Sequence, residues 1–348
     1  MTPARSQFDS LQGVRAAAAM MVVLFHVKTY TLPVVAGVAA PVWAGWSMGY
    51  AGVEIFFVLS GFIMVHVHGR EFSLPGRAQA FLRRRIIRIY PFLWVVLIAT
   101  AFLRLAANGT VPTPWAVVAA FSLWPDFSAP IIEVAWSLSF EMLFYLMFAL
   151  GLLRLRLGLA AGIVWFGGSA LTVISGHQGP GSAFLFSPYN LLFLFGMAAA
   201  LTYRRLGPRA GAALAGGAAL FLAVGLAEAY GLADWAFGWR TVLYGAGATG
   251  IIAGLAALDA AGRIATPRWL SFLGDASYAV YLLHIAAMTV TAKVLVAAGL
   301  AGALPAWALA ALLAAAAAAA GAVAHVAVER PLLAALRRRP AERLGVAP

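Results

Sequence analysis

Apolar stretches of about 20 residues recur along almost the whole chain, and this repetition limits the possible fold more than any other feature. A helix that crosses the hydrocarbon core of a bilayer needs about 20 largely apolar residues, because it rises only about 1.5 Å per residue. The mean hydropathy of +0.90 and the 10% share of charged residues exclude an ordinary soluble domain. We therefore predict an all-α, polytopic membrane protein.

The apolar pattern predicts ten transmembrane helices. The first stretch, residues 16–27, resembles the apolar part of a signal peptide, but no Ala-x-Ala cleavage site follows it, so we interpret it as a retained span. Residues 115–124 are too short to cross and are bracketed by prolines, which predicts a re-entrant or interfacial segment. The predicted spans are 13–30, 48–68, 89–107, 131–153, 157–175, 184–203, 210–230, 239–258, 275–297 and 303–328.

The distribution of basic residues predicts the orientation of these helices. Of the 24 Lys and Arg residues, only Lys28, Arg104, Arg240 and Lys293 fall at one set of helix ends, which leaves 20 at the other set and at the termini. Because cytoplasmic loops carry the excess of Lys and Arg, we expect both termini to be cytoplasmic. Residues 1–335 then form one membrane domain and residues 336–348 a basic cytoplasmic tail. With the charges placed in this way, the net charge of +12 does not indicate a nucleic-acid partner.

The absence of cysteine excludes several kinds of chemistry. A chain without cysteine has no disulfides, no thiolate nucleophile and no cysteine metal ligands, although this leaves the redox compartment undetermined. No two of the six histidines share one helix face at a metal-ligand spacing, so we expect no metal site.

Arg15 and His26 are ionisable residues in the first predicted span. Such residues are costly in lipid unless they are paired or line a polar cavity, which makes them candidates for function. They are 11 positions apart, and 11 steps of about 100° return to almost the same direction, so the two side chains share one helix face about 16 Å apart. The spacing alone is equally consistent with His26 being an interfacial histidine near the outer helix end.

Glu54 and Glu141 are two carboxylates in predicted spans. Glu54 is followed by Ser-Gly at 60–61, which allows close helix approach, and a structural alternative is that it pairs with Lys28 or Arg240. Glu141 has Ser137 and Tyr145 one helical turn away as hydrogen-bond partners. It could orient a histidine, or it could be a structural anchor between helices.

Four arginines stand in six positions immediately before the third predicted span, at 83, 84, 85 and 88. The planar guanidinium group matches phosphate oxygens, so this cluster could bind a diphosphate. Anionic lipid headgroups are an alternative ligand for the same charges.

These segments together resemble the acyltransferase family 3 membrane proteins over nearly the whole chain. The family's signature is an arginine and a histidine with ten residues between them in the first helix, as Arg15 and His26 are here. The other matching motifs are Gly-Val-Glu, Phe-Phe and Ser-Gly-Phe within residues 52–62, Arg85-Ile-Ile-Arg88, Trp-Ser-Leu-Ser-Phe-Glu at 136–141 with Phe-Tyr at 144–145, Gly-Asp-Ala-Ser-Tyr-Ala-Val-Tyr-Leu-Leu-His at 274–284, and Glu-Arg-Pro at 329–331.

The resemblance implies an enzyme that moves an acyl group, usually acetyl, from acyl-CoA to a hydroxyl of a carbohydrate. Within the family, the chain is similar to the standalone bacterial exopolysaccharide acetyltransferases, since it ends soon after the tenth span. This similarity implies a multi-pass protein of the bacterial inner membrane. Val14 stands where leucine is common, and Glu54 where aspartate is more frequent. Acetyl-CoA would be the donor substrate and the carbohydrate, free or lipid-linked, the acceptor, with lipids around the helices and no permanently bound cofactor.

The resemblance also gives each singled-out residue a role. Arg15, Arg85 and Arg88 would bind the phosphates of acyl-CoA, which is made in the cytoplasm. His26 would act as general base or as a transient acyl carrier, Glu141 as its orienting partner or proton acceptor, and Glu54 would hold the acceptor or His26.

Three other interpretations remain open from the sequence. The chain could be a transporter or flippase that uses its intramembrane carboxylates for proton coupling, although no internal repeat is apparent. The acceptor could be an antibiotic, a lipid or a glucan, and the donor group could be succinyl. The modified sugar and hydroxyl, the side of transfer and the oligomeric state are not determined by the sequence.

Overall fold

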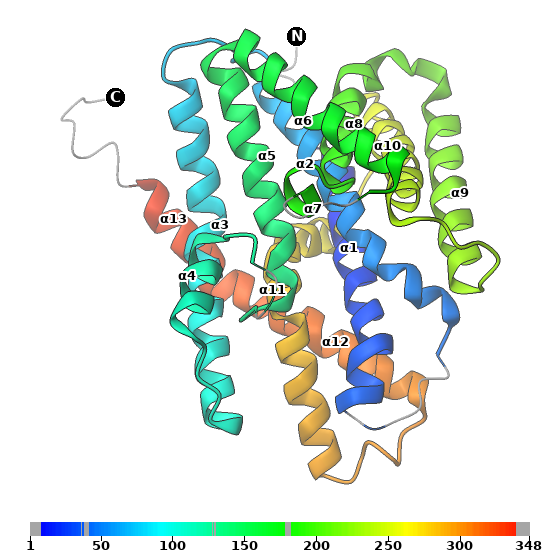
Figure 1. Ribbon diagram of the computed structural model, residues 1–348. Coiled ribbons are helices and arrows are strands. Elements are labelled where there is room, and N and C mark those ends of the chain that lie inside the picture. The colour runs from blue at the N-terminus through cyan, green and yellow to red at the C-terminus, as the bar shows by residue number, and fades with distance from the viewer. Residues whose placement is uncertain are drawn as a thin grey trace.

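In the part of the chain that the structure describes, ten helices are long and apolar enough to cross a membrane, as the hydropathy pattern predicts (Figure 1). A computed structural model describes residues 8–338 except 36, 38–41, 127, 129 and 178–181. The described residues contain no strand. The elements are α1 (Asp9–His26), η1 (Val27–Val35), η2 (Ala44–Ala51), α2 (Gly52–His68), α3 (Arg77–Asn108), α4 (Pro114–Ser122), η3 (Glu133–Ala135), α5 (Trp136–Leu153), α6 (Leu155–Ser175), α7 (Ser182–Leu185), α8 (Tyr189–Thr202), η4 (Tyr203–Arg205), η5 (Gly207–Arg209), α9 (Ala210–Ala229), α10 (Phe237–Ala260), α11 (Arg268–Ala297), α12 (Ala306–Ala324), η6 (His325–Glu329) and α13 (Arg330–Arg338).

The ten predicted spans all correspond to spanning helices, and the differences lie at helix ends. Helix α3 begins at Arg77 instead of residue 89, because arginine is a good helix former and a charged first turn can project from the lipid. The last span continues through the π-helical turn η6 into α13. The predicted tail, residues 336–348, therefore begins inside α13, and its part from 339 onward lies outside the described residues.

The loops divide into two sets at opposite ends of the bundle. The α2–α3, α5–α6 and α8–α9 connections carry the arginines and lie at one end, which we name the arginine-rich end. The α3–α4, α9–α10 and α11–α12 connections lie at the opposite end (Figure 1). The short apolar segment predicted at 115–124 forms α4 at this opposite end, where Thr113 Oγ1 accepts a hydrogen bond from the Ala116 N–H (3.1 Å) and caps the helix.

Helix α2 is the central helix, and glycines allow its neighbours to approach its backbone. A Cβ added at Gly61 would lie 2.1 Å from the carbonyl oxygen of Phe193 in α8, and one added at Gly196 would lie 1.9 Å from that of Val58. Only glycine permits such backbone contact between two helices, which is the packing device expected in lipid.

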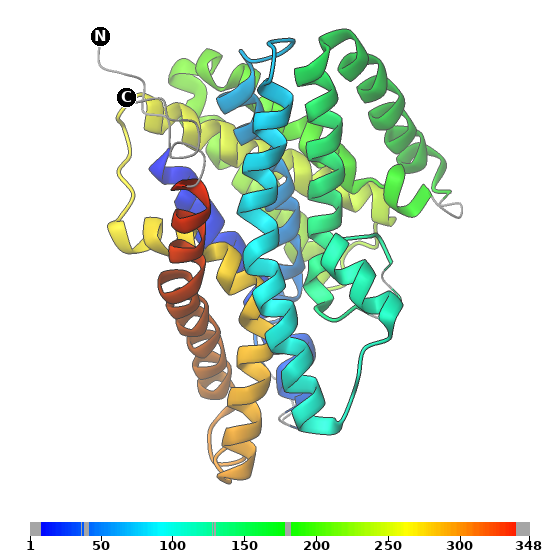
Figure 2. The same cartoon turned by 90° about the vertical axis from the view of Figure 1, so that its left-hand side faces the viewer.

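Helices α1, α3 and α11 meet α2 and α5 around the middle of the bundle. Gly52 brings α2 against Ala18 of α1, since a Cβ there would lie 2.3 Å from the Ala18 carbonyl oxygen. Helix α11 packs along α1 on one side and along α12 on the other. Figure 2 shows α3 in front, with α11 and the α12–α13 segment beside it. These five helices enclose the polar side chains described next.

Candidate active site

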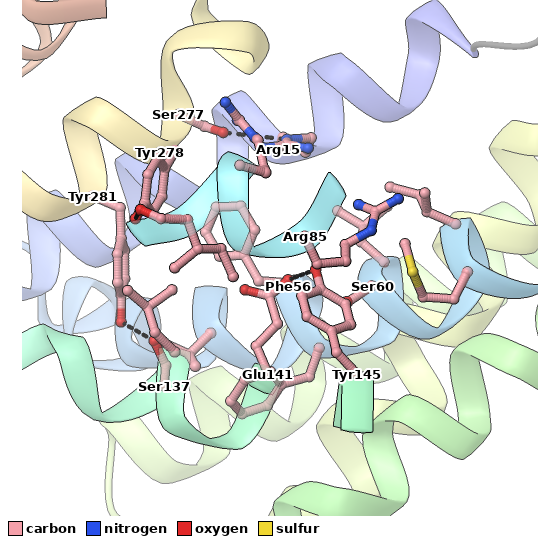
Figure 3. Close-up of a pocket in the computed structure, with 18 residues that line it drawn as sticks. Arg15, Phe56, Ser60, Arg85, Ser137, Glu141, Tyr145, Ser277, Tyr278 and Tyr281 are labelled. Carbon is pink, nitrogen blue, oxygen red and sulfur yellow. Dashed lines mark hydrogen bonds between the residues drawn. The ribbon is translucent and has the colours of Figure 1, made fainter. Parts of the chain in front are cut away.

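A cavity of about 150 Å³ lies between α1, α2, α3, α5 and α11 (Figure 3). Four of the six residues that the sequence singles out line it: Arg15, Arg85, Arg88 and Glu141. They come from three helices that are far apart in the sequence, so the fold brings them together. Three guanidinium groups face one carboxylate, which makes this cavity suited to an anionic ligand.

The arginines of the cavity keep much of their hydrogen-bonding capacity. Arg15 Nε donates to Ser277 Oγ (3.2 Å), and Arg88 forms an ion pair with the buried carboxylate of Glu329. Arg85 lies over the rings of Phe81 and Tyr145, 5.5 Å from each centroid, and its buried Nε has no partner among the described residues. A guanidinium has five N–H donors, so Arg15 and Arg85 can still bind oxygens of a ligand.

Arg84, in the same arginine run, faces away from the cavity. Its guanidinium lies 3.9 Å from Glu71 in the α2–α3 loop, which also lies 3.5 Å from Arg77. Partial burial raises the pKa of Glu71, but the hydrogen bond with His68 (2.8 Å) and the nearby arginines lower it by more, so its pKa is below the usual value. The arginines of this run therefore have different surroundings. Arg84 lies near Glu71 in the α2–α3 loop, whereas Arg85 and Arg88 line the cavity.

Glu141 is held by hydroxyl groups of two helices. Tyr145 Oη donates to its Oε1 at 2.5 Å, as the helical spacing predicts, and Ser60 Oγ of α2 donates at 3.2 Å. The predicted hydrogen bond from Ser137 is wrong, because the Ser137 hydroxyl contacts Tyr281 Oη (2.8 Å) instead. Two donors on one oxygen fix the carboxylate at the cavity wall.

His26 lies beyond the cavity and contacts a second histidine. Its Nδ1 is 3.2 Å from Nε2 of His284 in α11, and the two ring centroids are 4.9 Å apart. Arg15 and His26 both reach α11, at Ser277 and at His284, which confirms that they share one face of α1. His26 is the last α-helical residue before the π-helix η1, a type of local distortion that is frequent at functional sites.

The hydrogen bonds assign the protons on the two rings. His284 Nδ1 is 2.7 Å from the Tyr281 carbonyl oxygen, and His26 Nδ1 is 2.9 Å from that of Val22. Carbonyl oxygens only accept, so both Nδ1 atoms carry a proton. In neutral rings His284 Nε2 then accepts from His26 Nδ1–H, and His26 Nε2 keeps its lone pair, as a general base requires.

A wall of side chains separates the cavity from the histidine pair. Tyr281 lines the cavity, and its ring lies 6.0 Å from that of His284, three residues further along α11. Its hydroxyl also donates to the Val134 carbonyl oxygen (2.9 Å) and meets Ser137 Oγ, while Phe56 packs edge-on against the ring at 6.0 Å. The histidine pair is therefore one helical turn beyond the end of the cavity.

Among the described residues, neither of the two predicted carboxylates forms a hydrogen bond with His26. Glu141 bonds to Ser60 and Tyr145, and the side chain that contacts the His26 ring is His284. Glu54 is 1% exposed in the first turn of α2, and its Oε2 has no partner within the described part of the chain. Neither alternative partner forms an ion pair with it in the described structure, since Lys28 donates to Ser47 Oγ (2.6 Å) and Arg240 pairs with Glu228 (2.8 Å).

Several site residues escape the sequence interpretation. Tyr278, Tyr281 and His284 recur at every third position of one helix, so they lie on the same side of it. This spacing is the sequence feature that could have predicted their place in the site. Nothing in the sequence connects Ser60 to Glu141 or Glu329 to Arg88, since those pairs join helices distant in the chain. Residues 8–35, 37, 42–126, 128, 130–177 and 182–338 contain no group of three or more His, Asp and Glu residues that could hold a metal ion.

Comparison with known proteins identifies the family. The chain matches the acyltransferase domain over residues 8–325. It is 33% identical over 309 residues to the exopolysaccharide production protein ExoZ of Rhizobium meliloti (strain 1021), covering 84% of this chain and 92% of that protein. It is 29% identical over 309 residues to the putative membrane-bound transacylase BcsY of Komagataeibacter xylinus, covering 79% and 71%.

A shorter match, 27% identical over 164 residues, covers 42% of this chain and 25% of a putative O-acetyltransferase of Staphylococcus aureus (strain COL). No solved structure matches the chain. The predicted resemblance is confirmed along with the ten spanning helices. The chain belongs to the acyltransferase family that this domain defines, and it is a multi-pass membrane O-acyltransferase.

Proposed function

We propose that this acyltransferase uses acyl-CoA, most simply acetyl-CoA, to acetylate a hydroxyl of an exported carbohydrate such as exopolysaccharide, in the bacterial inner membrane with both termini in the cytoplasm. The observation that carries the proposal is the arginine-lined cavity, which lies between the arginine-rich end and the His26–His284 pair. The names of two relatives, an exopolysaccharide production protein and a putative O-acetyltransferase, agree with it.

The charge of the cavity supports acyl-CoA as the donor. Coenzyme A carries a diphosphate and a 3'-phosphate, and Arg15 and Arg85 have donors free for phosphate oxygens. The volume of about 150 Å³ is smaller than a whole small-molecule site, which is about 300–1,000 Å³. The cavity therefore accommodates part of the donor, with the phosphates at the arginines and the thin pantetheine arm directed toward Tyr281.

The histidine pair supports general base catalysis by His26. Nε2 of His26 accepts the proton of the acceptor hydroxyl, and the hydroxyl oxygen forms a bond to the thioester carbonyl carbon. The carbon–sulfur bond then breaks, and the leaving thiolate takes the proton from His26, which returns to its neutral form. Since His284 holds Nδ1–H of His26 in place, it acts as a positioning residue. For the acyl group to reach His26, the Tyr281 side chain must move aside.

Release of free coenzyme A tests the proposal against the transporter interpretation. The protein reconstituted in vesicles receives acetyl-CoA and deacylated exopolysaccharide, and a thiol reagent reports the released coenzyme. Because the chain has no cysteine, the protein contributes no background. We expect thiol release that depends on the carbohydrate, whereas a transporter or flippase would release none.

Replacement of His26 tests its proposed role as general base, with a second histidine variant as the control. We expect His26→Ala to lower kcat by about 10²- to 10⁴-fold, which is the contribution of a positioned general base. His177→Ala is the control, because His177 is an exposed histidine of the α6–α7 connection. Wild-type turnover in His26→Ala would contradict the mechanism.

Mass spectrometry of surface glycans from a deletion strain would distinguish acetyl from succinyl transfer and carbohydrate from other acceptors.

A further inference from the structure

A second cavity, of about 470 Å³, lies on the other side of His26, toward the end opposite the arginine-rich loops. Phe25, Ser47, Tyr50, Glu228 and Arg240 line it. Its walls are the end of α1, the helix η2, the last turn of α9 and the first turn of α10. The volume falls within the range of about 300–1,000 Å³ that is typical of small-molecule sites.

We propose that this second cavity binds the carbohydrate acceptor and presents one of its hydroxyls to His26. The inference rests on the proposed function and adds to it the place and the residues of acceptor binding. It also implies that the acceptor reaches His26 from the end of the bundle opposite the donor.

The polar groups of the second cavity are held rigidly by one another. The Glu228 carboxylate accepts hydrogen bonds from Tyr50 Oη (2.5 Å), Tyr244 Oη (2.9 Å) and Arg240 Nη1 (2.8 Å). The Arg240 guanidinium stacks over the rings of Tyr50, at 5.0 Å, and Phe237, at 5.7 Å. Groups that are already fixed lose little entropy when a ligand binds, so the cluster is preorganised.

This combination of groups fits a sugar better than a phosphate. A sugar ring has an apolar C–H face and an edge of hydroxyls that both donate and accept, so it needs aromatic rings beside planar charged groups. The aromatic rings of Phe25 and Tyr50 line the cavity, and its one guanidinium is neutralised by its one carboxylate. The donor cavity, with three guanidiniums around one carboxylate, instead has an excess of positive charge.

Arg240 retains unused donors at this cavity. Only its Nη1 bonds to Glu228, and its Nε is buried without a partner in the described part of the chain. A guanidinium has five N–H groups, and a buried donor without a partner is costly. A hydroxyl oxygen of a bound sugar would satisfy such a donor.

The second cavity is one side-chain layer from the base. Phe25 lines it, and the Phe25 ring lies 5.0 Å from the His26 ring and 5.7 Å from the Tyr50 ring. On the other side of His26, the His284 and Tyr281 rings lead to the donor cavity. His26 thus lies between the two cavities. A general base that takes a proton from the acceptor while the acceptor reacts with the donor has to lie there.

Steady-state kinetics with two variants and a matched control test the inference. With oligosaccharides from deacylated exopolysaccharide as acceptor, Arg240→Gln and Tyr50→Phe should raise the acceptor KM at least tenfold and leave the acetyl-CoA KM within twofold. Tyr230→Phe is the control, because Tyr230 is an exposed tyrosine at the same end that does not line the cavity, so its acceptor KM should stay within twofold. An equal rise in Tyr230→Phe, or a raised acetyl-CoA KM in Arg240→Gln, would overturn the inference.

A labelling experiment tests acceptor binding without turnover. The cysteine-free chain accepts a single cysteine at Ser47, which lines the second cavity, or at Ala303, an exposed residue of the α11–α12 loop at the same end. We expect the oligosaccharides to slow maleimide labelling of Ser47→Cys at least fivefold and to leave Ala303→Cys unchanged. Absence of protection at Ser47→Cys refutes the acceptor site, whereas absence of thiol release by the wild-type protein refutes the proposed function.

Discussion

The contact between His26 and His284 makes a quantitative prediction about turnover. His284→Leu removes the acceptor of His26 Nδ1–H, while His284→Gln keeps an acceptor oxygen on a side chain of similar size. A hydrogen bond contributes about 1–1.5 kcal/mol net, and about 1.36 kcal/mol is a factor of ten in rate, so kcat should fall about five- to fifteen-fold in His284→Leu. The loss is partial because Val22 still holds the same proton.

The assay is carbohydrate-dependent thiol release at saturating acetyl-CoA, normalised to folded protein. His284→Gln should stay within about threefold of wild type, because an amide oxygen can accept the same hydrogen bond. A merely structural role would affect both variants alike, since both replace a fully buried ring. Equal losses in the two variants, an unchanged kcat in His284→Leu, or an effect confined to the acetyl-CoA KM would refute the positioning role.

Three further variants test the donor cavity and the packing. Arg85→Gln should raise the acetyl-CoA KM about ten- to one-hundred-fold at nearly constant kcat, because hydrogen bonds to charged groups contribute about 1.5–3 kcal/mol; an unchanged KM would place the phosphates elsewhere. Glu329→Gln leaves the Arg88 charge without its buried partner, which costs about 3–5 kcal/mol, so size-exclusion chromatography after heating should show a lower melting temperature. Gly61→Ala should destabilise by about 1–3 kcal/mol in the same assay, unlike Gly216→Ala, whose Cβ meets no atom within 4 Å; equal stability of these two variants would contradict the packing argument.

Local sequence features predicted the spanning helices and the face that Arg15 and His26 share. Both depend on hydropathy and helical period, which are properties of a single segment. The hydrogen bond between Tyr145 and Glu141 was predictable for the same reason, since the two residues are one helical turn apart. Helix ends were less predictable, because charged turns such as that at Arg77 continue a helix beyond its apolar part.

Contacts between helices could not be predicted from these local rules. Ser137 and Ser60 were both available to Glu141 by composition, but Ser137 contacts Tyr281 of α11, and Ser60 of α2 donates to Glu141. The partner of His26 depends in the same way on the axial register of α1 against α11, which places His284 beside it. Glu54 is buried in the first turn of α2, and its roles as acceptor ligand or partner of His26 remain predictions.

The wall at Tyr281 has a consequence for the membrane itself. A protein hollowed from both ends could allow protons to cross and dissipate the proton-motive force of an energised membrane. The Tyr281 and Ser137 hydroxyls lie within hydrogen-bond distance of each other and of the Val134 carbonyl oxygen, so their protons have acceptors within the wall. Under the proposed function, the closed wall opposes this leak between turnovers, and an acyl group passes when the Tyr281 side chain moves aside.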